Sequence, residues 1–369
     1  MISLWEQQSL LEYDVIIVGA GITGLSTAAS LKEKNPALNL LIIERSALPS
    51  GASTKNAGFA CFGSIAELAG DQLALGDEGM VRLVKKRWSG LKKTAERLGE
   101  KNIGLLRKGG YELVSEKNLD DLNRIESINK LLADIFEDSV FSNQSQKIKD
   151  FKFGNTSALI FNQFEAQLDT GELIKSLWKY CSQLGIHIIT GTEVTGITDQ
   201  KVLTASYNFK AKAVAVCTNA FTNSLLKEKI NLKPGRGMVL LVKPKSPTDI
   251  SGTFHYDEGY YYFRDYHGKL IFGGGRNLAL EEEATTSFGI NPLIEEKLIC
   301  DLKEIILPNQ DFEIEMKWSG IMAFGPNKEP VIGKTADLIY MGVRLGGMGV
   351  ALGSMVGEEL AELILQDHF

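Results

Sequence analysis

The chain has 369 residues and a formal net charge of -6, a length at which about two domains are usual. The acidic balance and the absence of a lysine- or arginine-rich run argue against nucleic acid as a partner, and four scattered cysteines argue against a metal site or structural disulfides. Glu6 interrupts the N-terminal residues where a signal peptide would be apolar, and no run reaches the ~20 apolar residues of a membrane span. We therefore expect a cytoplasmic protein with no membrane span.

The chain opens with the pattern of a dinucleotide-binding βαβ unit. An apolar strand over residues 15–18 precedes a G-x-G-x-x-G turn, a helix continues to Lys34, and an apolar strand over 40–43 ends at Glu44. The glycines allow a tight turn, close approach of a pyrophosphate to backbone amides at the helix start, and close helix–strand packing. The carboxylate can accept hydrogen bonds from ribose hydroxyls. The predicted nucleotide contacts are Gly19, Gly21, Ile22, Thr23, Gly24, Glu44 and Arg45.

The remaining elements alternate between helical and strand-like patterns. Small and hydroxylated residues over 51–63 predict a loop that wraps around a ligand. Apolar residues at spacings of three and four predict helices, and short β-branched or alternating runs predict strands. The expected helices cover 67–98, 118–136, 169–184 and 354–366, and the expected strands cover 110–114, 187–190, 193–197, 213–216, 238–242, 260–264, 270–272 and 338–341.

These elements predict an α/β fold with a discontinuous Rossmann-like domain, because nucleotide-binding patterns occur at the start, middle and end of the chain. An antiparallel sheet within an inserted α+β substrate domain accounts for the strands after residue 237. The predicted cofactor domain comprises residues 1–80, 150–228 and 325–369, and the predicted substrate domain comprises 81–149 and 229–324.

The second glycine-rich turn favours FAD over a nicotinamide cofactor, which would call for a second half-Rossmann unit soon after the first. Three glycines within four residues precede the last helix, so backbone amides there can face an anion. Reduced flavin carries such a charge at its pyrimidine end, and stabilising it favours hydride acceptance. A turn that merely closes the last strand onto its helix is the alternative. The predicted flavin contacts are Gly346, Gly347, Met348, Gly349 and Val350.

Over nearly its full length the chain resembles the FAD-dependent D-amino-acid oxidase, glycine oxidase and sarcosine oxidase superfamily. The resemblance rests on the N-terminal glycines, the 51–58 loop, Cys217-Thr-Asn-Ala, Trp318-Ser-Gly, Glu329-Pro-Val-Ile-Gly333 and the last turn, which follow one another in the family's order. It implies that Val194 contacts adenine and that Thr218 lies near the ribityl chain. Ser53, Thr54 and Met348 stand where some relatives carry the histidine or cysteine that attaches flavin, which implies non-covalent FAD. The loop residues implied to line the pyrophosphate and flavin are Ser53, Thr54, Asn56, Ala57 and Gly58.

The resemblance also implies oxidation of a carbon–nitrogen bond in a small amine or amino acid. The hydride goes to flavin N5 and leaves an imine, and oxygen or another acceptor reoxidises the flavin. Relatives often carry a carboxylate-binding arginine shortly after a Trp-x-Gly motif, where this chain has Met322. On a strand, Tyr260, Tyr262 and Arg264 project to one side and can replace it. The further candidates are Arg276 and Arg344, and Tyr261 if the register slips by one residue.

Other titratable residues are expected to have structural roles. We expect His255 and His267 in turns or at the surface, and Cys61 and Cys217 packed beside the cofactor. Alternative functions are a flavin-dependent 2-hydroxyacid dehydrogenase, which would need a histidine base, a flavoprotein acting on a nucleic-acid base, and a non-catalytic flavin carrier. The substrate, the electron acceptor and the oligomeric state stay open.

Overall fold

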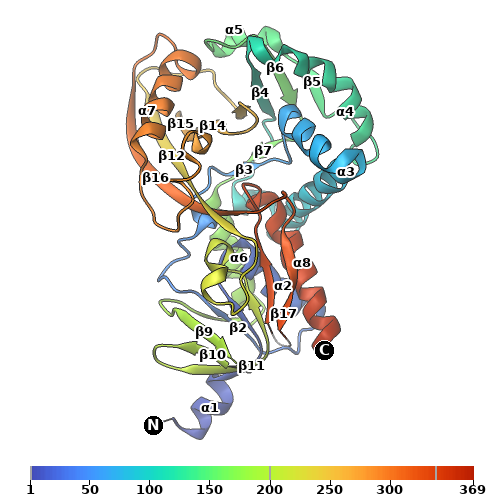
Figure 1. Ribbon diagram of the computed structural model, residues 1–369, viewed down its shortest axis with the longest axis vertical. Helices are drawn as coiled ribbons and strands as arrows, with labels where there is room; N and C mark the ends of the chain where they lie inside the picture. The colour runs from blue at the N-terminus through green and yellow to red at the C-terminus, as the bar shows by residue number, and fades with distance from the viewer. Residues whose placement is uncertain (1, 199–200, 337–338) are drawn as a thin grey trace.

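The computed structural model describes residues 2–198, 201–336 and 339–369. Two large sheets lie one above the other along the longest axis of the molecule, the first in the lower half of Figure 1 and the second in the upper half. The predicted α/β class is confirmed.

The first sheet is parallel at its centre, where apolar runs are buried on both faces. Its strand order is β17-β18-β11-β1-β2-β8, with β1 parallel to both β2 and β11, and an antiparallel extension of β10 and β9 joins at β11. Such a centre needs cover on each side, and two separate apolar clusters supply it. The strands are β1 (Glu12–Val18), β2 (Leu40–Ile43), β8 (His187–Ile189), β9 (Val194–Thr198), β10 (Lys201–Thr204), β11 (Asn208–Val216), β17 (Val331–Ala336) and β18 (Ile339–Val343).

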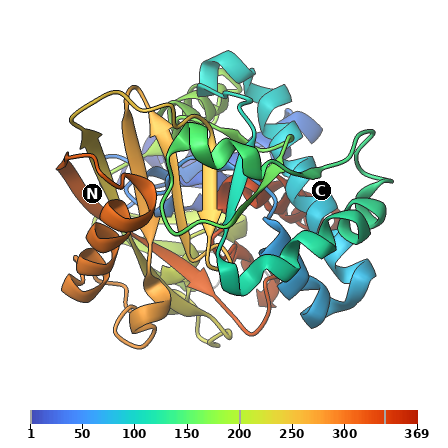
Figure 2. The same cartoon turned by 90° about the horizontal axis from the view of Figure 1, so that it is seen from above.

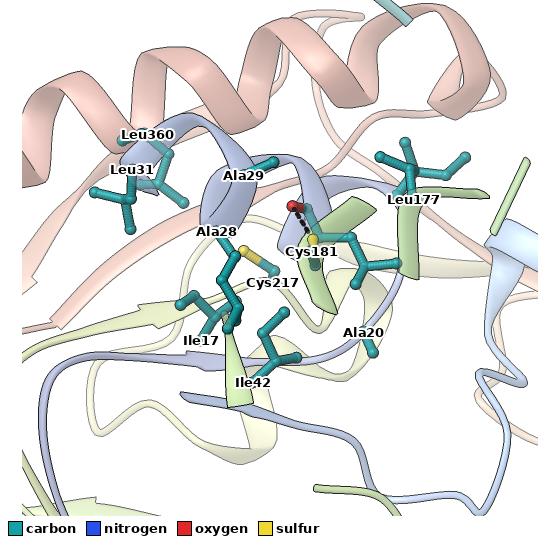
Figure 3. Close-up of a cluster of buried hydrophobic side chains, with 14 of the residues drawn as sticks. Ile17, Ala20, Ala28, Ala29, Leu31, Ile42, Leu177, Cys181, Cys217 and Leu360 are labelled. Atoms are coloured by element: carbon teal, nitrogen blue, oxygen red, sulfur yellow. Dashed lines mark hydrogen bonds between the residues drawn. The ribbon is translucent and has the colours of Figure 1, made fainter. Parts of the chain in front are cut away.

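Glycines let α2 (Ile22–Lys34) pack closely both on the first sheet and on α8 (Gly349–His368). A side chain at Gly24 would place its Cβ 1.9 Å from the Gly19 carbonyl oxygen, and one at Gly357 would come within 2.7 Å of the Thr27 amide nitrogen. Beneath α2, the Cys181 thiol donates to the Leu25 carbonyl at 3.3 Å, within the apolar cluster drawn in Figure 3. The two helices that begin at the glycine-rich turns therefore lie against each other.

The second sheet has the order β16-β12-β15-β14-β13-β4-β6-β5 and is antiparallel except where β4 runs parallel to β13. The helices α3 (Ile65–Leu98) and α4 (Ile125–Leu132) pack on one face beside β4 to β6, and α7 (Pro292–Asp301) lies on the opposite side, as the view from above shows (Figure 2). The strands are β4 (Gly110–Val114), β5 (Phe141–Asn143), β6 (Ala158–Asn162), β12 (Lys233–Pro244), β13 (Thr253–Tyr256), β14 (Tyr261–Tyr266), β15 (Lys269–Gly274) and β16 (Phe312–Phe324).

Three boundaries differ from the sequence prediction. The strand β6 pairs with β4 and β5 and therefore belongs to the second sheet. The sequence prediction places it, with residues 150–228, in the cofactor domain. The predicted helix over 118–136 is a 3-10 turn over Glu116–Arg124 followed by α4, and α8 begins before residue 354. The other elements are α1 (Leu4–Leu10), α3 (Ile65–Leu98), α4 (Ile125–Leu132), α5 (Ile148–Phe151), α6 (Thr170–Gln183), α7 (Pro292–Asp301), β3 (Phe59–Ala60) and β7 (Ala166–Gln167).

Among the described residues, no helix combines the length and the apolar character that crossing a bilayer requires.

Candidate active site

A cavity of about 750 Å³ lies between the two sheets and is lined by both glycine-rich turns. It follows the carboxyl ends of β1, β2 and β11, the edge at which ligands bind in open α/β sheets. Residues of β12, β13, β14 and β16 form its other wall. The cavity therefore lies between the nucleotide-binding edge of the first sheet and a wall formed by the second sheet.

The N-termini of α2 and α8 both reach this cavity. Neither helix has a side-chain hydrogen bond at its N-cap, which is Gly21 in α2 and Met348 in α8. Apart from the Ile22 amide, their first-turn amides therefore keep donors and partial positive charge for an anion. At α2 the Ser53 hydroxyl already accepts from the Ile22 amide at 3.0 Å, so the small-residue loop lies directly over the helix start.

Glu44 is fixed at the carboxyl end of β2 by two backbone amides. Its carboxylate accepts hydrogen bonds from the Ala20 amide at 3.0 Å and the Ser46 amide at 3.2 Å. The next residue, Arg45, stacks its guanidinium on the Phe221 ring at 3.9 Å. Both residues line the cavity. This is the position expected of a carboxylate that binds ribose hydroxyls.

The loop over 51–58 is shaped by its own side chains. The Thr54 hydroxyl donates to the Pro49 carbonyl at 2.9 Å, and the Asn56 amide group donates to the Ser53 carbonyl at 3.0 Å while accepting from the Gly58 amide at 2.9 Å. Gly58 has a φ of 77°, and a Cβ there would meet the Leu168 carbonyl oxygen at 2.3 Å. These contacts hold the loop in one conformation beside α2.

The predicted cofactor residues divide into those that line the cavity and those that support it. Gly24, Thr54 and Gly58 lie behind its surface and shape the turn and the loop. The predicted residues that line the cavity are Gly19, Gly21, Ile22, Thr23, Glu44, Arg45, Ser53, Asn56, Ala57, Val194, Thr218, Gly346, Gly347, Met348, Gly349 and Val350.

The tyrosines at the start of β14 and just before it alternate as predicted. Tyr260 and Tyr262 line the cavity, whereas Tyr261 is buried in the core on the opposite face and stacks on Tyr256. Burial raises the pKa of Tyr262 to about 12. A neutral phenol therefore faces the cavity at physiological pH.

Arg264 does not face the cavity, and its expected role as a carboxylate clamp is corrected. Its side chain is buried, its Nε donates to the Ala57 carbonyl, and its Nη2 donates to the Leu168 carbonyl at 3.1 Å. The guanidinium binds backbone because the cofactor loop and the residue after β7 cover the end of β14. It fastens the loop to the second sheet.

Arg344 lines the cavity, but much of its guanidinium is engaged by a neighbouring loop. Its Nε and Nη2 donate to the Glu329 carbonyl at 3.2 and 3.0 Å, and Nη2 also donates to the Asn327 side chain at 2.9 Å. The residue has a φ of 65°, a left-handed conformation that favours glycine. We assign Arg344 to shaping the second glycine-rich turn.

Arg276, just after β15, has an uncommitted guanidinium on the cavity wall formed by the second sheet, whereas the other ring-stacked arginine without a polar partner among the described residues, Arg45, lies beside Glu44 on the nucleotide side. The Arg276 guanidinium stacks on Phe324 at 4.0 Å and has no hydrogen bond or ion pair with any other described residue. Burial lowers its pKa, although the nearby Tyr260, Glu283 and Tyr262 oppose that shift. Met322 lines the same cavity, and both side chains lie over glycines of β12. Only the three-dimensional neighbours distinguish Arg276 from the other candidates.

His255 is buried on β13 and lines the cavity, so the expectation that it lies in a turn or at the surface is wrong. Its Nε2 is hydrogen-bonded to a carboxylate oxygen of Glu165, which also accepts from the Thr253 hydroxyl at 2.8 Å. Burial opposes the charged imidazole, but the charge and hydrogen bond of Glu165 outweigh it and raise the pKa of His255 to about 9. In contrast, His267 is exposed in a turn.

The cysteines behave as packed thiols. Cys61 and Cys217 line the cavity and are buried, and burial raises the pKa of each thiol. The Cys61 thiol lies 4.0 Å from the Met348 sulfur, and non-covalent attachment of FAD stays a prediction. Ligand-type atoms of Cys61, Glu165 and His255 lie within 4.8 Å of one another. The expected absence of a metal ion stays a prediction.

The residues present fit FAD. Two uncapped helix starts lie on one cavity, and glycines in the first turn leave space that side chains would fill. A carboxylate stands at the end of the second strand. Residues 14–363 match the family described as FAD dependent oxidoreductase. The chain belongs to this family of FAD-dependent oxidoreductases.

Known proteins similar to this FAD-dependent oxidoreductase agree with that assignment. It is 22% identical over 376 residues to the probable oxidoreductase OrdL of Haemophilus influenzae, an alignment that covers 96% of this chain and 83% of that protein. It is 25% identical over 213 residues to the D-amino acid dehydrogenase of Vibrio atlanticus, covering 53% and 48% of the two chains.

Solved structures show the same fold. Glycine oxidase from Geobacillus kaustophilus aligns with a TM-score of 0.78 at 19% identity, covering 97% of this chain and 96% of that one. L-proline dehydrogenase from P. horikoshii aligns with a TM-score of 0.75 at 20% identity, covering 97% and 95%.

Proposed function

We propose that this FAD-dependent oxidoreductase oxidises the carbon–nitrogen bond of a small amino acid or N-substituted amino acid to an imine. The observation that carries the proposal is the unpaired guanidinium of Arg276 on the cavity wall, with the hydroxyl of Tyr262 on the same wall. A guanidinium and a phenol together bind a carboxylate with two or more hydrogen bonds. We assign substrate carboxylate binding to Arg276 in place of Arg264.

The chain's residues orient the substrate and exclude water. FAD, when bound, supplies the acceptor for the hydride that leaves the substrate's α-carbon. With its carboxylate fixed at Arg276, an amino acid has its α-carbon and nitrogen confined in a small volume. Phe59 packs edge-on against Tyr262, with ring centroids 5.6 Å apart, and keeps this part of the cavity apolar. Oxygen or another acceptor would then reoxidise the cofactor.

The names of similar proteins support this substrate class. They include a D-amino acid dehydrogenase, a glycine oxidase and an L-proline dehydrogenase, which share amino-acid substrates by name. Amino-acid substrates of either hand appear among them. The proposal therefore names the bond and the carboxylate, and leaves the configuration at the α-carbon to experiment.

Oxidation of a 2-hydroxyacid is a second candidate because of one specific observation. Alcohol oxidation needs a base for the hydroxyl proton, and His255 lines the cavity with Glu165 behind it. A 2-hydroxyacid carries the same carboxylate for Arg276. The two candidates therefore differ only in the heteroatom on the α-carbon.

Anaerobic flavin reduction distinguishes them. The purified FAD-loaded protein is mixed without oxygen with glycine, D- and L-amino acids, N-methyl amino acids, simple amines and 2-hydroxyacids, and the flavin absorbance is followed. We expect bleaching by at least one amino acid, and little bleaching by the matching amine that lacks a carboxylate. Bleaching by hydroxyacids alone would replace the proposal with the second candidate, and no bleaching by any compound would favour a flavin carrier.

A further inference from the structure

A buried histidine–carboxylate pair in the cavity wall has no part in holding FAD or the substrate carboxylate as described above. His255 is 5% exposed and Glu165 is 1% exposed. They lie 90 residues apart in the chain and meet because β4, β13 and the segment before β7 pack together. A buried ionisable pair that reaches a reaction cavity is a candidate for proton transfer.

The fold makes room for the pair and fixes its orientation. Gly110 is the register partner of Thr253, and a Cβ at Gly110 would lie 2.4 Å from the Glu165 carboxyl carbon. The Thr253 hydroxyl donates to Glu165, and the Phe59 ring packs edge-on against the imidazole with centroids 5.0 Å apart. These contacts fix the Glu165 carboxylate on the side of the imidazole away from the cavity and fix the His255 ring in the cavity wall.

One ring nitrogen of His255 stays available. The Nε2 atom is committed to Glu165, whereas Nδ1 has no hydrogen bond to any other described residue. Among the described residues, Nδ1 is also not one of the fully buried polar atoms that lack a partner, so part of its surface is accessible. Because His255 lines the cavity, we take this accessible surface to face the cavity. Glu165 does not line the cavity, so a proton from the substrate would be received by His255. This is the carboxylate–imidazole–substrate order of general-base sites.

We infer that His255 accepts the proton that the substrate's α-heteroatom must lose, and that Glu165 positions His255 and stabilises the imidazolium. The inference rests on the proposed function and adds a catalytic residue to it. An ammonium N–H proton, or the hydroxyl proton of a 2-hydroxyacid, passes to Nδ1. The freed electron pair forms the C=N or C=O bond as the α-hydrogen leaves with its two electrons as hydride to the flavin.

The groups around His255 determine how the rate of flavin reduction depends on pH. Because Glu165 and the other carboxylates raise its pKa to about 9, the imidazole is charged at neutral pH and becomes a base only as the pH rises. Flavin reduction should therefore accelerate up to about pH 9. The titratable groups that act on or lie beside His255 are Glu165, Glu112 of β4, Glu67 of α3, Cys61 after β3, and Tyr262, its register partner on β14.

The test compares single-turnover flavin reduction across pH in FAD-loaded wild type, His255→Gln, Glu165→Gln and His267→Gln. We expect His255→Gln to lower the rate by about 10²- to 10⁴-fold, the usual contribution of a general base, and to abolish the alkaline rise. Glu165→Gln should move that rise to lower pH, because the main source of the raised pKa is gone. His267→Gln, at an exposed turn, should match wild type.

A second measurement needs no turnover. Isotope-labelled histidine gives one imidazole titration for each of the four histidines in the chain, and the signal absent from His255→Gln is that of His255. Its pKa should fall in Glu165→Gln.

A His255→Gln protein that keeps its FAD and reduces it within threefold of the wild-type rate would overturn the inference, as would an unchanged titration in Glu165→Gln. If His255→Gln does not fold, the Glu165→Gln pH profile and titration decide. If no amine, amino acid or hydroxyacid reduces the wild-type flavin, the proposed function itself fails and takes this inference with it.

Discussion

The Arg264 guanidinium donates a hydrogen bond to the Leu168 carbonyl at 3.1 Å, across 96 residues of sequence. A second donor of the same group binds the Ala57 carbonyl in the loop over the α2 start. One buried side chain therefore connects a strand of the second sheet, the segment after β7 and the loop over 51–58. The link adds polar contacts to the apolar cluster that Ala57 forms with Tyr262 and Tyr266 of β14, and we expect its loss to loosen the loop.

Arg264→Met should weaken the fold and FAD retention while leaving substrate binding nearly unchanged. Each buried carbonyl that loses its donor costs about 1–3 kcal/mol, so the free energy of unfolding should fall by roughly 2–4 kcal/mol. Urea unfolding and the flavin content of purified protein measure the effect. Arg107→Met, at an exposed arginine, should change stability by less than about 0.5 kcal/mol. A raised KM in the FAD-loaded fraction of Arg264→Met would restore the clamp role to this residue.

Arg276→Met should raise the KM for carboxylate-bearing substrates by about 10- to 100-fold, because a charge-assisted hydrogen bond contributes roughly 1.5–3 kcal/mol. Amines without a carboxylate should lose little. Steady-state kinetics with matched pairs of substrates measure the difference. Adding Met322→Arg to Arg276→Met should recover part of the loss if a guanidinium from β16 reaches the same carboxylate. Equal losses for both members of each pair would exclude carboxylate binding by Arg276.

Glu112→Gln should stabilise the protein at neutral and alkaline pH. Burial raises the pKa of this carboxyl from 4.5 to about 7, although Ser64 and the Ala66 amide donate to it. A raised folded-state pKa contributes stability that is full below 4.5 and is lost as the pH rises through about 7. A neutral glutamine keeps one acceptor for both donors. Urea unfolding of the FAD-saturated proteins should show an advantage of about 1–3 kcal/mol for Glu112→Gln at pH 8, and little difference at pH 5. A pH-independent difference would contradict the raised pKa.

Gly357→Ala should separate α8 from α2 and reduce both stability and flavin content. Its Cβ would lie 2.7 Å from the Thr27 amide nitrogen and the Ser26 Cβ, and overpacking of this kind costs about 1–3 kcal/mol or more. Gly333→Ala is the control, because that glycine of β17 lies outside the cavity lining and has open space where the methyl group would be placed. The control should be neutral or stabilised by up to about 1 kcal/mol. Thermal unfolding followed by flavin fluorescence compares the two variants, and equal behaviour would show that the helix contact is not tight.

The parts of the fold that are predictable from the sequence are those with local signals. The turn at Gly19 and Gly21, the acid at Glu44 and the turn at Gly346 follow from glycine conformations and short apolar runs. FAD as the cofactor and the α/β class follow from these signals and from the family resemblance, and both are confirmed. The alternation of Tyr260 and Tyr262 toward one side is likewise a local property of a strand.

The substrate side was less predictable because its residues are selected by distant neighbours. Arg264 and Arg276 both follow apolar strand residues, and only the carbonyls of Ala57 and Leu168 decide which guanidinium is engaged. The position of His255, in contrast, has a local signal in the sequence. In Thr253-Phe-His-Tyr256 it alternates with the core aromatics, which places it on the face shared with Thr253. Its partner Glu165 carries no such signal.

The helix that begins at Gly349 is the last element of the chain, and it packs on the helix that follows the first strand. During synthesis, a nascent chain whose residues 349–368 are still inside the ribosome would present the first glycine-rich turn but not the amides at the start of α8. Tight cofactor uptake therefore has to wait until α8 can fold onto α2, and products truncated before Gly349 should be purified colourless.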